Sequence, residues 1–511
     1  MVSTAQGTAV GTRLSRAQRW MLTVSCLCVA LVVAAMAALY SALPGIAAET
    51  GVTQQQLTWV VDGYTLALAC LVLPAGALGD RLGRRVVLII GMAVFTVASA
   101  LPLLFDGPLW LIGARAAAGA GAAFVMPSTL SLLTAGFPEE QRGRAVGIWA
   151  GVAGSGGALG IIGSGILLRW LSWQSVFVAM TVVGAVLLIA GFTVSESVDA
   201  ERPPLDPWGS LSVVCAVAAI VVAAMEVPSR GWLDSLVLGL LAGGLLTALV
   251  FVLVELRVPH PLLDVRLFAD RGFASGTLSL TVQFLVSFGL FMLIVQYLQL
   301  ILGYSPLGSS LALGPMVVPL VLVSLFAPRL AERFGLRLVS LVGLTMVGIG
   351  LLVTARLQLD SGYWGVLWSL LIMSTGMGLC TAPATAAIVA GTPVAKHGVA
   401  AAVNDAAREI GAALGIAVAG SVLAAGYAHR IAPALPKLPE SARGPVGDSL
   451  AAALQVAERG GPAAKPLADF ARAAFLHGFQ QAGMALGGAA LVSAVFIAAF
   501  APGRDSQPIA S

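Results

Sequence analysis

Long apolar segments dominate this sequence and limit what it can fold into. Runs of about 20 residues with few charges recur from Trp20 almost to the C-terminus, and each is long enough to cross a bilayer as an α-helix. Of the 511 residues, 58% are hydrophobic and 10% are charged, whereas soluble domains contain about 25% charged residues. So few charges cannot cover a water-facing surface, and we therefore expect an all-α, polytopic membrane protein.

The apolar runs predict fourteen transmembrane helices with both termini in the cytoplasm. In this topology the short outer loops hold only Arg169, Arg230 and Arg356 as basic residues, and an excess of Lys and Arg is typical of cytoplasmic loops. We therefore expect a multi-pass protein of the cell membrane. The predicted spans are 20–41, 56–78, 86–105, 108–133, 143–168, 174–194, 208–227, 233–255, 272–302, 306–328, 337–357, 363–391, 398–426 and 477–501.

A charged loop, GALGDRLGRR, separates the second and third spans. Asp80 can cap the following helix, and three arginines in so short a loop favour the cytoplasmic face. The loop resembles the one between the second and third helices of the major facilitator superfamily, whose pattern is G-x-L-a-D-r-x-G-r-k. The resemblance implies a conformational latch, and the alternative is an ordinary basic hairpin. The residues that fit are Gly76, Leu78, Asp80, Arg81, Gly83, Arg84 and Arg85.

Two internal matches divide the chain into halves. A shift of 252 residues lays PRLAERFGLR, from Pro328, on the charged loop, and a shift of 255 lays GAALGIAVAG, from Gly411, on GGALGIIGSG, from Gly156. These offsets predict two pseudo-symmetric six-helix bundles with two inserted helices, the major facilitator fold, and a substrate site between the halves. The expected parts are a cytoplasmic leader (1–19), an N-terminal bundle (20–194), inserted helices 7 and 8 with their loops (195–271), a C-terminal bundle (272–501) with an external loop (427–476), and a cytoplasmic tail (502–511).

The thirteenth span carries three charges on one face. Asp405, Arg408 and Glu409 lie at i, i+3 and i+4, and the repeat places small residues at the matching positions of the first half. Intramembrane charges are costly and usually functional. Arg408 can neutralise one carboxylate, and the other can then hold either a proton or a cationic substrate. The alternative is a satisfied network that only stabilises the helix.

Two further intramembrane charges are candidates for proton coupling. Arg115, with Gly119 and Gly121, resembles the fourth-helix pattern R-x-x-x-G-x-G of the superfamily, which is linked there to proton coupling. The alternative is an arginine that bonds loop carbonyls to fix helix packing. Asp62 lies in WVVDGY, which resembles the W-[IV]-V-D-x-Y motif of the fourteen-helix drug:proton antiporters of the QacA/EmrB type. An acid at this depth can instead simply bond the outer loop.

The fifth span, GVAGSGGALGIIGSG, is rich in small residues that allow helices to pack closely. Through Gly156, Gly160 and Gly165 it resembles the antiporter signature g-x-x-x-G-P-x-x-G-G, with Ile161 at the proline position and Ser164 at one glycine. The resemblance implies packing between the halves that prevents leakage.

Two features of other spans bear on the substrate and the coupling. In the first span, Ala35 stands where these antiporters usually carry an aspartate, so coupling is expected to rest on the other acids. In the ninth span, Phe284, Phe288, Phe291 and Tyr297 can line a cavity for aromatic cations. Aromatic residues at this spacing more often simply pack.

Several classes of function are not expected. There is no Walker loop, so the proton gradient is the expected energy source and no cofactor is predicted. The five cysteines lie in apolar runs, so neither disulfides nor a metal site is expected. The four histidines lie in loops or at helix ends, which argues against an enzyme. The net charge of +4 does not imply nucleic acid.

The resemblance to QacA/EmrB-type exporters runs from about Trp20 to Gly426. It implies proton-coupled efflux of hydrophobic, cationic drugs and antibiotics by alternating access. The expected partners are a small-molecule substrate, protons and the lipid bilayer, and the expected state is a monomer. The alternative is a secondary transporter of one metabolite, in which the intramembrane acids are structural.

Overall fold

The computed structural model describes residues 14–50, 54–105, 107–197, 204–393 and 396–503, and this part of the chain is helical with no strand. The helices are α1 (Arg16–Thr50), α2 (Gln54–Leu82), α3 (Arg84–Ala100), α4 (Pro108–Gly136), α5 (Glu139–Leu168), α6 (Gln174–Gly191), α7 (Pro207–Arg230), α8 (Ser235–Glu255), α9 (Arg271–Gln296), α10 (Pro306–Leu313), α11 (Val317–Thr354), α12 (Gly362–Ala390), α13 (His397–Ile431), α14 (Glu440–Asp448), α15 (Leu450–Arg459) and α16 (Lys465–Phe500). Shorter turns are η1 (Leu101–Leu103), η2 (Val265–Ala269), η3 (Tyr297–Ile301), η4 (Gly314–Met316), η6 (Ala432–Lys437) and η7 (Gly461–Ala464).

Several helices begin at residues whose side chains cap them. Ser15 and Gln18 form a capping box at the start of α1, with each side chain bonded to the other residue's backbone N–H at 3.1 and 2.9 Å. Asp206, Asp234 and Asp270 each accept a backbone N–H at the starts of α7, α8 and α9. Polar side chains at the loop ends of apolar runs therefore set where these spans start.

The expected fold class is confirmed. In the described residues, thirteen helical segments are long and apolar enough to cross a membrane, and one of them, Leu307–Thr354, has 48 residues. The chain reverses inside α11 at Gly335, whose φ is +82°. Glycine adopts such angles without the steric cost that a side chain brings. The 48-residue segment therefore contains two membrane crossings, which meet inside α11. Counting these two separately gives fourteen crossings in the described residues.

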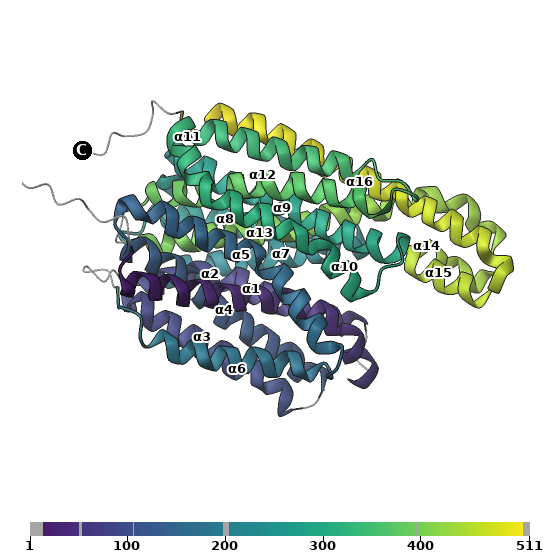
Figure 1. Cartoon of the computed structure of the whole chain (residues 1–511), viewed down its shortest axis with the longest axis horizontal. Coiled ribbons are helices and arrows are strands. Elements are labelled where there is room, and N and C mark those ends of the chain that lie inside the picture. The colour runs from purple at the N-terminus through teal and green to yellow at the C-terminus, as the bar shows by residue number, and fades with distance from the viewer. Residues whose placement is uncertain (1–13, 51–53, 106, 198–203, 394–395, 504–511) are drawn as a thin grey trace, which may run out of the picture.

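Two helical bundles lie side by side along the molecule (Figure 1). One buried core joins α1 to α6 and a second joins α9 to α13 with α16. The repeat is visible in the backbone, because Gly83 and Gly335, at matching places in the two halves, both have positive φ. Gly107 and Gly362, at the starts of α4 and α12, form a second such pair.

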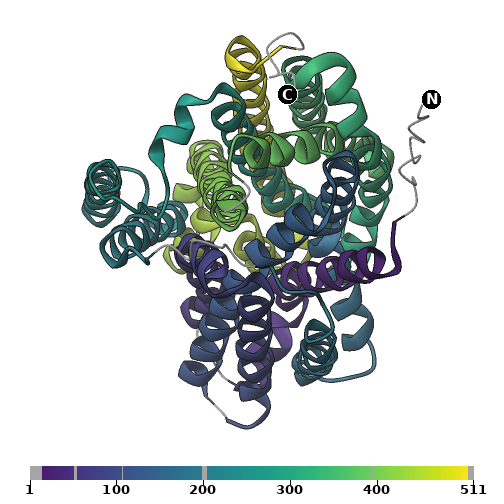
Figure 2. The ribbon, with the colours of Figure 1, turned by 90° about the vertical axis from the view of Figure 1, so that its left-hand side faces the viewer.

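The inserted helices α7 and α8 lie at the edge of the molecule (Figure 2). Val213 and Val217 of α7 share a buried cluster with Leu73 of α2 and Val403 of α13. At the end of the hairpin, Trp232 donates from Nε1 to Ser421 Oγ of α13 at 3.0 Å. The helices α7 and α8 therefore cover the outside of α2 and α13 and belong to neither six-helix bundle.

The helices α13 and α16 extend beyond the bundle and carry α14 and α15 between them (Figure 1). Tyr427 of α13 donates its hydroxyl hydrogen to the carbonyl of Val446 at 2.8 Å, which anchors α14 to the end of α13. The stretch 427–476, expected to be an external loop with some helix, consists mainly of helices and short turns.

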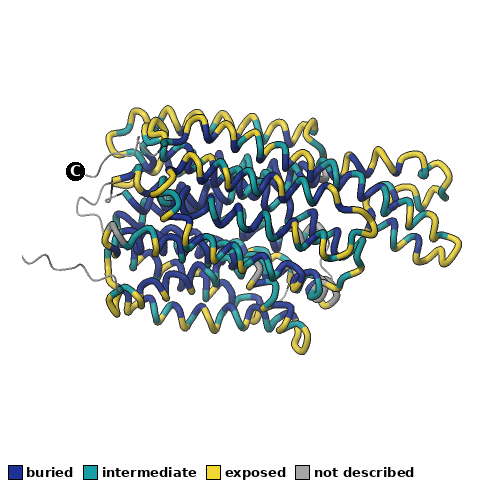
Figure 3. Tube along the Cα trace, turned by 45° about the horizontal axis from the view of Figure 1, so that its top comes forward, coloured by how far each residue is buried: buried dark blue, intermediate teal, exposed yellow. Residues whose placement is uncertain are grey.

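Exposed residues run along the outer faces of the bundles (Figure 3), and many of them are large and apolar. Leu245, Ile189 and Val97 are 64–69% exposed on α8, α6 and α3, on surfaces that no other described helix covers. Large exposed apolar side chains spread around a bundle are what lipid contact requires. The protein is therefore a multi-pass membrane protein.

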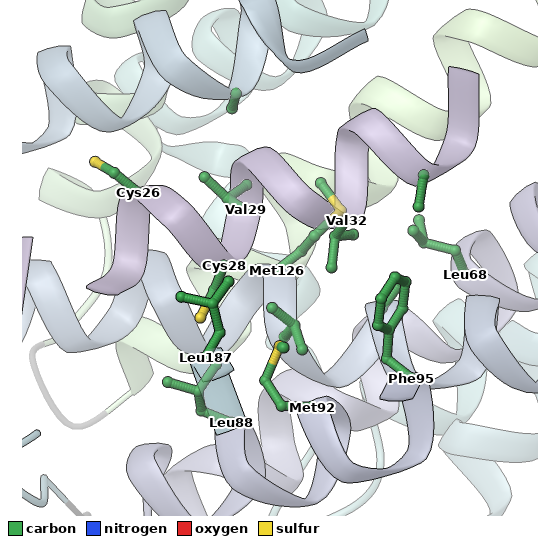
Figure 4. Close-up of a cluster of buried hydrophobic side chains, with 14 of the residues drawn as sticks. Cys26, Cys28, Val29, Val32, Leu68, Leu88, Met92, Phe95, Met126 and Leu187 are labelled. Carbon is green, nitrogen blue, oxygen red and sulfur yellow. The ribbon is translucent and has the colours of Figure 1, made fainter. Parts of the chain in front are cut away.

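The interior of the N-terminal bundle is tightly packed (Figure 4). Cys28 and Val32 of α1 point into a cluster with Met92 and Phe95 of α3 and Met126 of α4, and all five side chains are at most 3% exposed. Both thiols of α1, those of Cys26 and Cys28, are free. They behave as small apolar groups in this core.

Close packing of α9 against α13 yields the first prediction. A Cβ atom at Gly415 would meet the carbonyl of Leu285, and one at Gly411 would meet the carbonyl of Thr281. Gly415→Ala should lower the thermal midpoint of the purified protein, with a loss of about 1–3 kcal/mol from overpacking. Gly239→Ala in α8, where a Cβ meets no atom within 4 Å, is the control. Equal midpoints in the two variants would contradict this account of the α9–α13 contact.

Candidate functional site

Asp80 joins the two halves at one end of the bundle. Its carboxylate accepts hydrogen bonds from the backbone N–H groups of Gly398 and Val399, at 2.9 and 3.1 Å, and it pairs with Arg84 Nη2 at 2.9 Å. Gly398 and Val399 open α13, so the acid of α2 caps a helix of the other half. A negative charge at a helix N-terminus is favourable. The following helix, α3, begins at Arg84 after Gly83, and the capping partner of Asp80 is 318 residues away along the chain.

The rest of the latch loop is arranged around this cap. A Cβ atom at Gly76 would meet the carbonyl of Gly398, so only glycine allows α2 and α13 to approach this closely. Gly83 turns the chain with φ of +109°. Arg84 and Arg85 donate their backbone N–H groups to the segment after α6, Arg84 to Ser197 O at 2.9 Å and Arg85 to Glu196 Oε1 at 3.0 Å.

The remaining base of the loop, Arg81, is half-buried in the last turn of α2. Arg85 also forms an ion pair with Glu196, at 3.6 Å between Nε and Oε2. The segment after α6 therefore holds the latch loop within its own half, while Asp80 reaches across to the other half.

The three charges of α13 lie inside the protein. Asp405 and Arg408 are 0% and 3% exposed, and Glu409 is half-buried. Asp405 Oδ1 accepts from Asn404 Nδ2 at 3.1 Å and lies 3.9 Å from Arg408 Nη1. Thr385 of α12 donates to Asn404 Oδ1 at 2.8 Å, which holds the amide in place.

Arg408 lies between two aromatic rings. Its guanidinium carbon is 5.1 Å from the ring centre of Trp149 and 4.9 Å from that of Phe284. Cation–π contacts at these distances stabilise a buried guanidinium. Trp149 belongs to α5 and Phe284 to α9, so the two rings come from different halves. Trp149 is itself fixed by donating from Nε1 to Thr129 Oγ1 at 3.1 Å.

Arg115 is buried in the N-terminal half. It donates from Nε to the carbonyl of Val60 at 3.1 Å and from Nη2 to that of Ala35 at 3.3 Å, and its guanidinium lies 4.3 Å from the ring centre of Tyr64. Tyr64 in turn donates its hydroxyl hydrogen to Val32 O at 2.9 Å. The carbonyls come from helices α1 and α2. The carbonyl of Ala35 thus accepts a hydrogen bond from Arg115 at the position where the resemblance predicts an aspartate.

The structure brings some of the predicted residues together and leaves others apart. Glu409 of α13 interacts electrostatically with Tyr64, whose ring lies against Arg115. Asp62 is half-buried in α2. Within the described residues, no hydrogen bond or ion pair links its carboxylate to the charges of α13.

The glycines of the antiporter signature serve two different contacts. Cβ atoms at Gly156 and Gly160 would meet Val33 and the carbonyl of Ala34, so these two glycines pack α5 on α1 inside one half. A Cβ at Gly165 would meet Leu307 of the other half. The contact between halves continues along α5 at other glycines of the same helix, among them Gly147, which faces the carbonyl of Ser324 in α11.

Sequence reasoning missed Trp149. The available signal was a tryptophan in the middle of a small-residue span, far from the membrane interface where this residue is common. The aromatic run of α9 was recognised, and Phe284, Phe288 and Phe291 do form a ladder with ring centres 5.9 and 5.8 Å apart. Tyr297 is not part of it, because it stacks on Phe479 at 5.2 Å.

Chemically, the site can hold protons and charged groups. It joins two carboxylates and a guanidinium at the contact between the halves. Among the residues that the structure describes, no group of three or more His, Cys, Asp or Glu side chains is arranged to hold a metal ion.

Comparison with known proteins gives several relatives. The chain is 34% identical over 465 residues to multidrug efflux pump LfrA of Mycolicibacterium smegmatis, covering 89% of this chain and 92% of that protein. It is 32% identical over 469 residues to methyl viologen resistance protein SmvA of Salmonella typhimurium, covering 89% and 93%. It is 31% identical over 482 residues to the tetracenomycin C resistance and export protein of Streptomyces glaucescens, covering 91% and 88%.

Solved structures with the same fold include two transporters. The human organic anion transporter MFSD10 (TETRAN) matches with a TM-score of 0.62 at 14% identity, covering 94% of this chain and 100% of that one. The proton:xylose symporter XylE matches with a TM-score of 0.59 at 15% identity, covering 95% and 96%. These likenesses concern the fold alone.

The family follows from a match to a family model together with these relatives. Residues 25–416, most of the chain, match the Major Facilitator Superfamily. The fold is that of transporters, and the relatives are multidrug efflux and antibiotic-resistance proteins. This chain belongs to the Major Facilitator Superfamily.

Proposed function

We propose that this protein exports hydrophobic drugs and antibiotics, with cationic compounds among them, across the cell membrane in exchange for protons. The observation that carries the proposal is the α13 cluster at the contact between the halves, in which Asp405 and Arg408 are buried and Glu409 is half-buried. Intramembrane charges in such a place mark ion and substrate pathways. The names of the relatives, which refer to multidrug efflux, methyl viologen resistance and tetracenomycin C export, support the same function.

The proposed cycle is alternating access around the α13 charges. Arg408 neutralises Asp405, and Glu409 then exchanges a proton for substrate. A substrate that enters from the cytoplasm displaces the proton of Glu409, and a proton that arrives from outside later displaces the substrate. Because substrate and proton compete for one carboxylate, movement of one is linked to movement of the other.

The latch loop has a separate role in this cycle. With both termini in the cytoplasm, the bonds from Asp80 to α13 lie at the cytoplasmic end and hold it closed. Both halves belong to one chain, so the proposal is a monomer in the lipid bilayer. It needs no cofactor, since the proton gradient supplies the energy.

A second function is supported by the hydrogen bonds of the same cluster. Thr385, Asn404, Asp405 and Arg408 form a connected chain, as expected if the acids only stabilise α13. The protein would then transport one metabolite without using these acids for coupling.

Inside-out vesicles with an acidified interior separate the two functions. A pH-sensitive dye would report proton release when lipophilic cations and neutral antibiotics are added one at a time. Release on addition of several unrelated drugs supports drug efflux. No release from any compound, with the protein confirmed in the membrane, would favour the metabolite transporter.

Glu409→Gln tests the coupling role. The amide keeps the size of the side chain but cannot exchange a proton, so drug-induced proton release should fall at least about tenfold, which is the effect of about 1.4 kcal/mol. The amount of folded protein, measured by size-exclusion chromatography, should be unchanged. Glu458→Gln, on the exposed face of α15, is the matched control. Normal coupling in the α13 variant would remove Glu409 from the mechanism.

Asp80→Asn tests the latch. The asparagine loses the ion pair with Arg84 and one of the two bonds to α13, and hydrogen bonds to a charged group contribute about 1.5–3 kcal/mol. The transport rate should fall about tenfold or more, while substrate affinity changes less than about twofold. Asp469→Asn, which breaks an exposed ion pair with Arg472, should leave both unchanged. Loss of substrate binding by the α2 variant would argue against a conformational role.

A further inference from the structure

One edge of the Arg408 guanidinium has no partner. Its Nε and Nη2 atoms are buried and have no hydrogen-bond partner among the described residues. A buried donor without a partner is costly, and a guanidinium carries five N–H donors. Arg408 is only 3% exposed, so the two donors without a partner indicate that another group completes their bonds.

The two free atoms are neighbours on the side-on edge of the guanidinium. Their N–H groups point the same way in one plane, the geometry that binds a carboxylate through two parallel hydrogen bonds. Asp405 does not use this edge. It lies 3.9 Å away on the Nη1 side, too far for a hydrogen bond.

The rings of Trp149 and Phe284 restrict the position of Arg408. Its guanidinium carbon lies 5.1 Å from the ring centre of Trp149 and 4.9 Å from that of Phe284, so both rings pack against the charged group. Stacking of this kind leaves the N–H edge available and cuts the entropy lost on binding.

The position of the edge connects it to the transport path. Trp149 comes from the N-terminal half, whereas Phe284 and Arg408 come from the C-terminal half. Separation of the halves would therefore move the Trp149 ring away from Arg408, and closure would bring it back.

We propose that the Nε–Nη2 edge of Arg408 binds a planar two-oxygen group of the substrate, a carboxylate being the best fit. This rests on the proposed export function and refines its substrate class. Preferred substrates are planar aromatic compounds that carry a carboxylate, and a positive charge elsewhere on the molecule is compatible with the neighbouring acids Asp405 and Glu409.

A matched pair of dyes tests this proposal. Rhodamine 110 carries a free carboxylate, and rhodamine 123 is its methyl ester, while both share the same cationic xanthene. Binding to the purified protein in lipid nanodiscs would be measured by fluorescence polarisation. Wild-type protein should bind rhodamine 110 about tenfold more tightly than rhodamine 123, the size expected of a charge-assisted pair of hydrogen bonds.

Two substitutions of Arg408 decide whether this residue is responsible. Arg408→Gln removes the charge, and Arg408→Lys keeps it but removes the two-pronged edge. Both should reduce the preference for rhodamine 110 to less than about twofold, because neither offers two parallel donors. Arg472→Gln, which removes an exposed arginine near the start of α16, should keep the wild-type preference.

The outcomes separate this proposal from the export function. Equal affinity of wild-type protein for the two dyes would overturn the carboxylate site, as would a preference that folded Arg408→Lys protein retains. If Arg408→Gln fails to fold, the lysine variant decides alone. Proton release by drugs in vesicles without a dye preference would leave export intact and remove the site. A dye preference without proton release would support the carboxylate site and contradict proton-coupled export.

Discussion

Charge buried between two helical halves is the constraint on which this structure depends. In a bilayer, a charged side chain must find its partners inside the protein. Arg115 uses two carbonyls and a ring, Arg408 uses two rings and an acid, and Asp80 uses two backbone N–H groups. Apart from Asp405, which lies on the same helix as Arg408, these partners come from other helices. The cost of burying each charge is therefore offset by tying helices together.

The contacts between the halves suit a protein that must open and close. Gly76 and Gly398 meet backbone to backbone, and Gly147 lies against the carbonyl of Ser324. Such surfaces have few side chains that interlock, so they can part without repacking a core. The specific interactions between the halves are few and involve charged groups. They are the hydrogen bonds by which Asp80 caps α13 at one end and the contact of the Trp149 ring with Arg408 further in. Opening must break these, which makes them the places where ligand or proton can bias the equilibrium.

Much of the fold could be predicted from the sequence, because spans, caps and the repeat are local patterns. The repeat of the charged loop predicted two halves, and Gly83 and Gly335 adopt matching positive φ angles. Span ends were less accurate, since α13 continues to Ile431 and α16 begins at Lys465, well inside the predicted external loop. Apolar content does not show where a helix stops once it has left the membrane.

The partners of the site residues could not be predicted. The sequence identified the charges of α13 but did not show that Trp149 contacts them. Trp149 lies 259 residues before Arg408, in a span rich in small residues. The capping partner of Asp80 is more distant still, at 318 residues. Which helix faces which depends on the packing of the two halves, and no periodicity within one span contains that information. The roles of Asp62, Arg115 and Glu409 in coupling remain predictions of the motif resemblance and of their burial.

Proton release on substrate binding tests the central claim most directly. Isothermal titration of purified protein with a transported drug, in buffers of different ionisation enthalpy, counts the protons released for each drug molecule bound. The account predicts about one proton per drug molecule in wild-type protein near neutral pH and about none in Glu409→Gln. Binding without proton release by the wild-type protein, or the same release from both proteins, would contradict it.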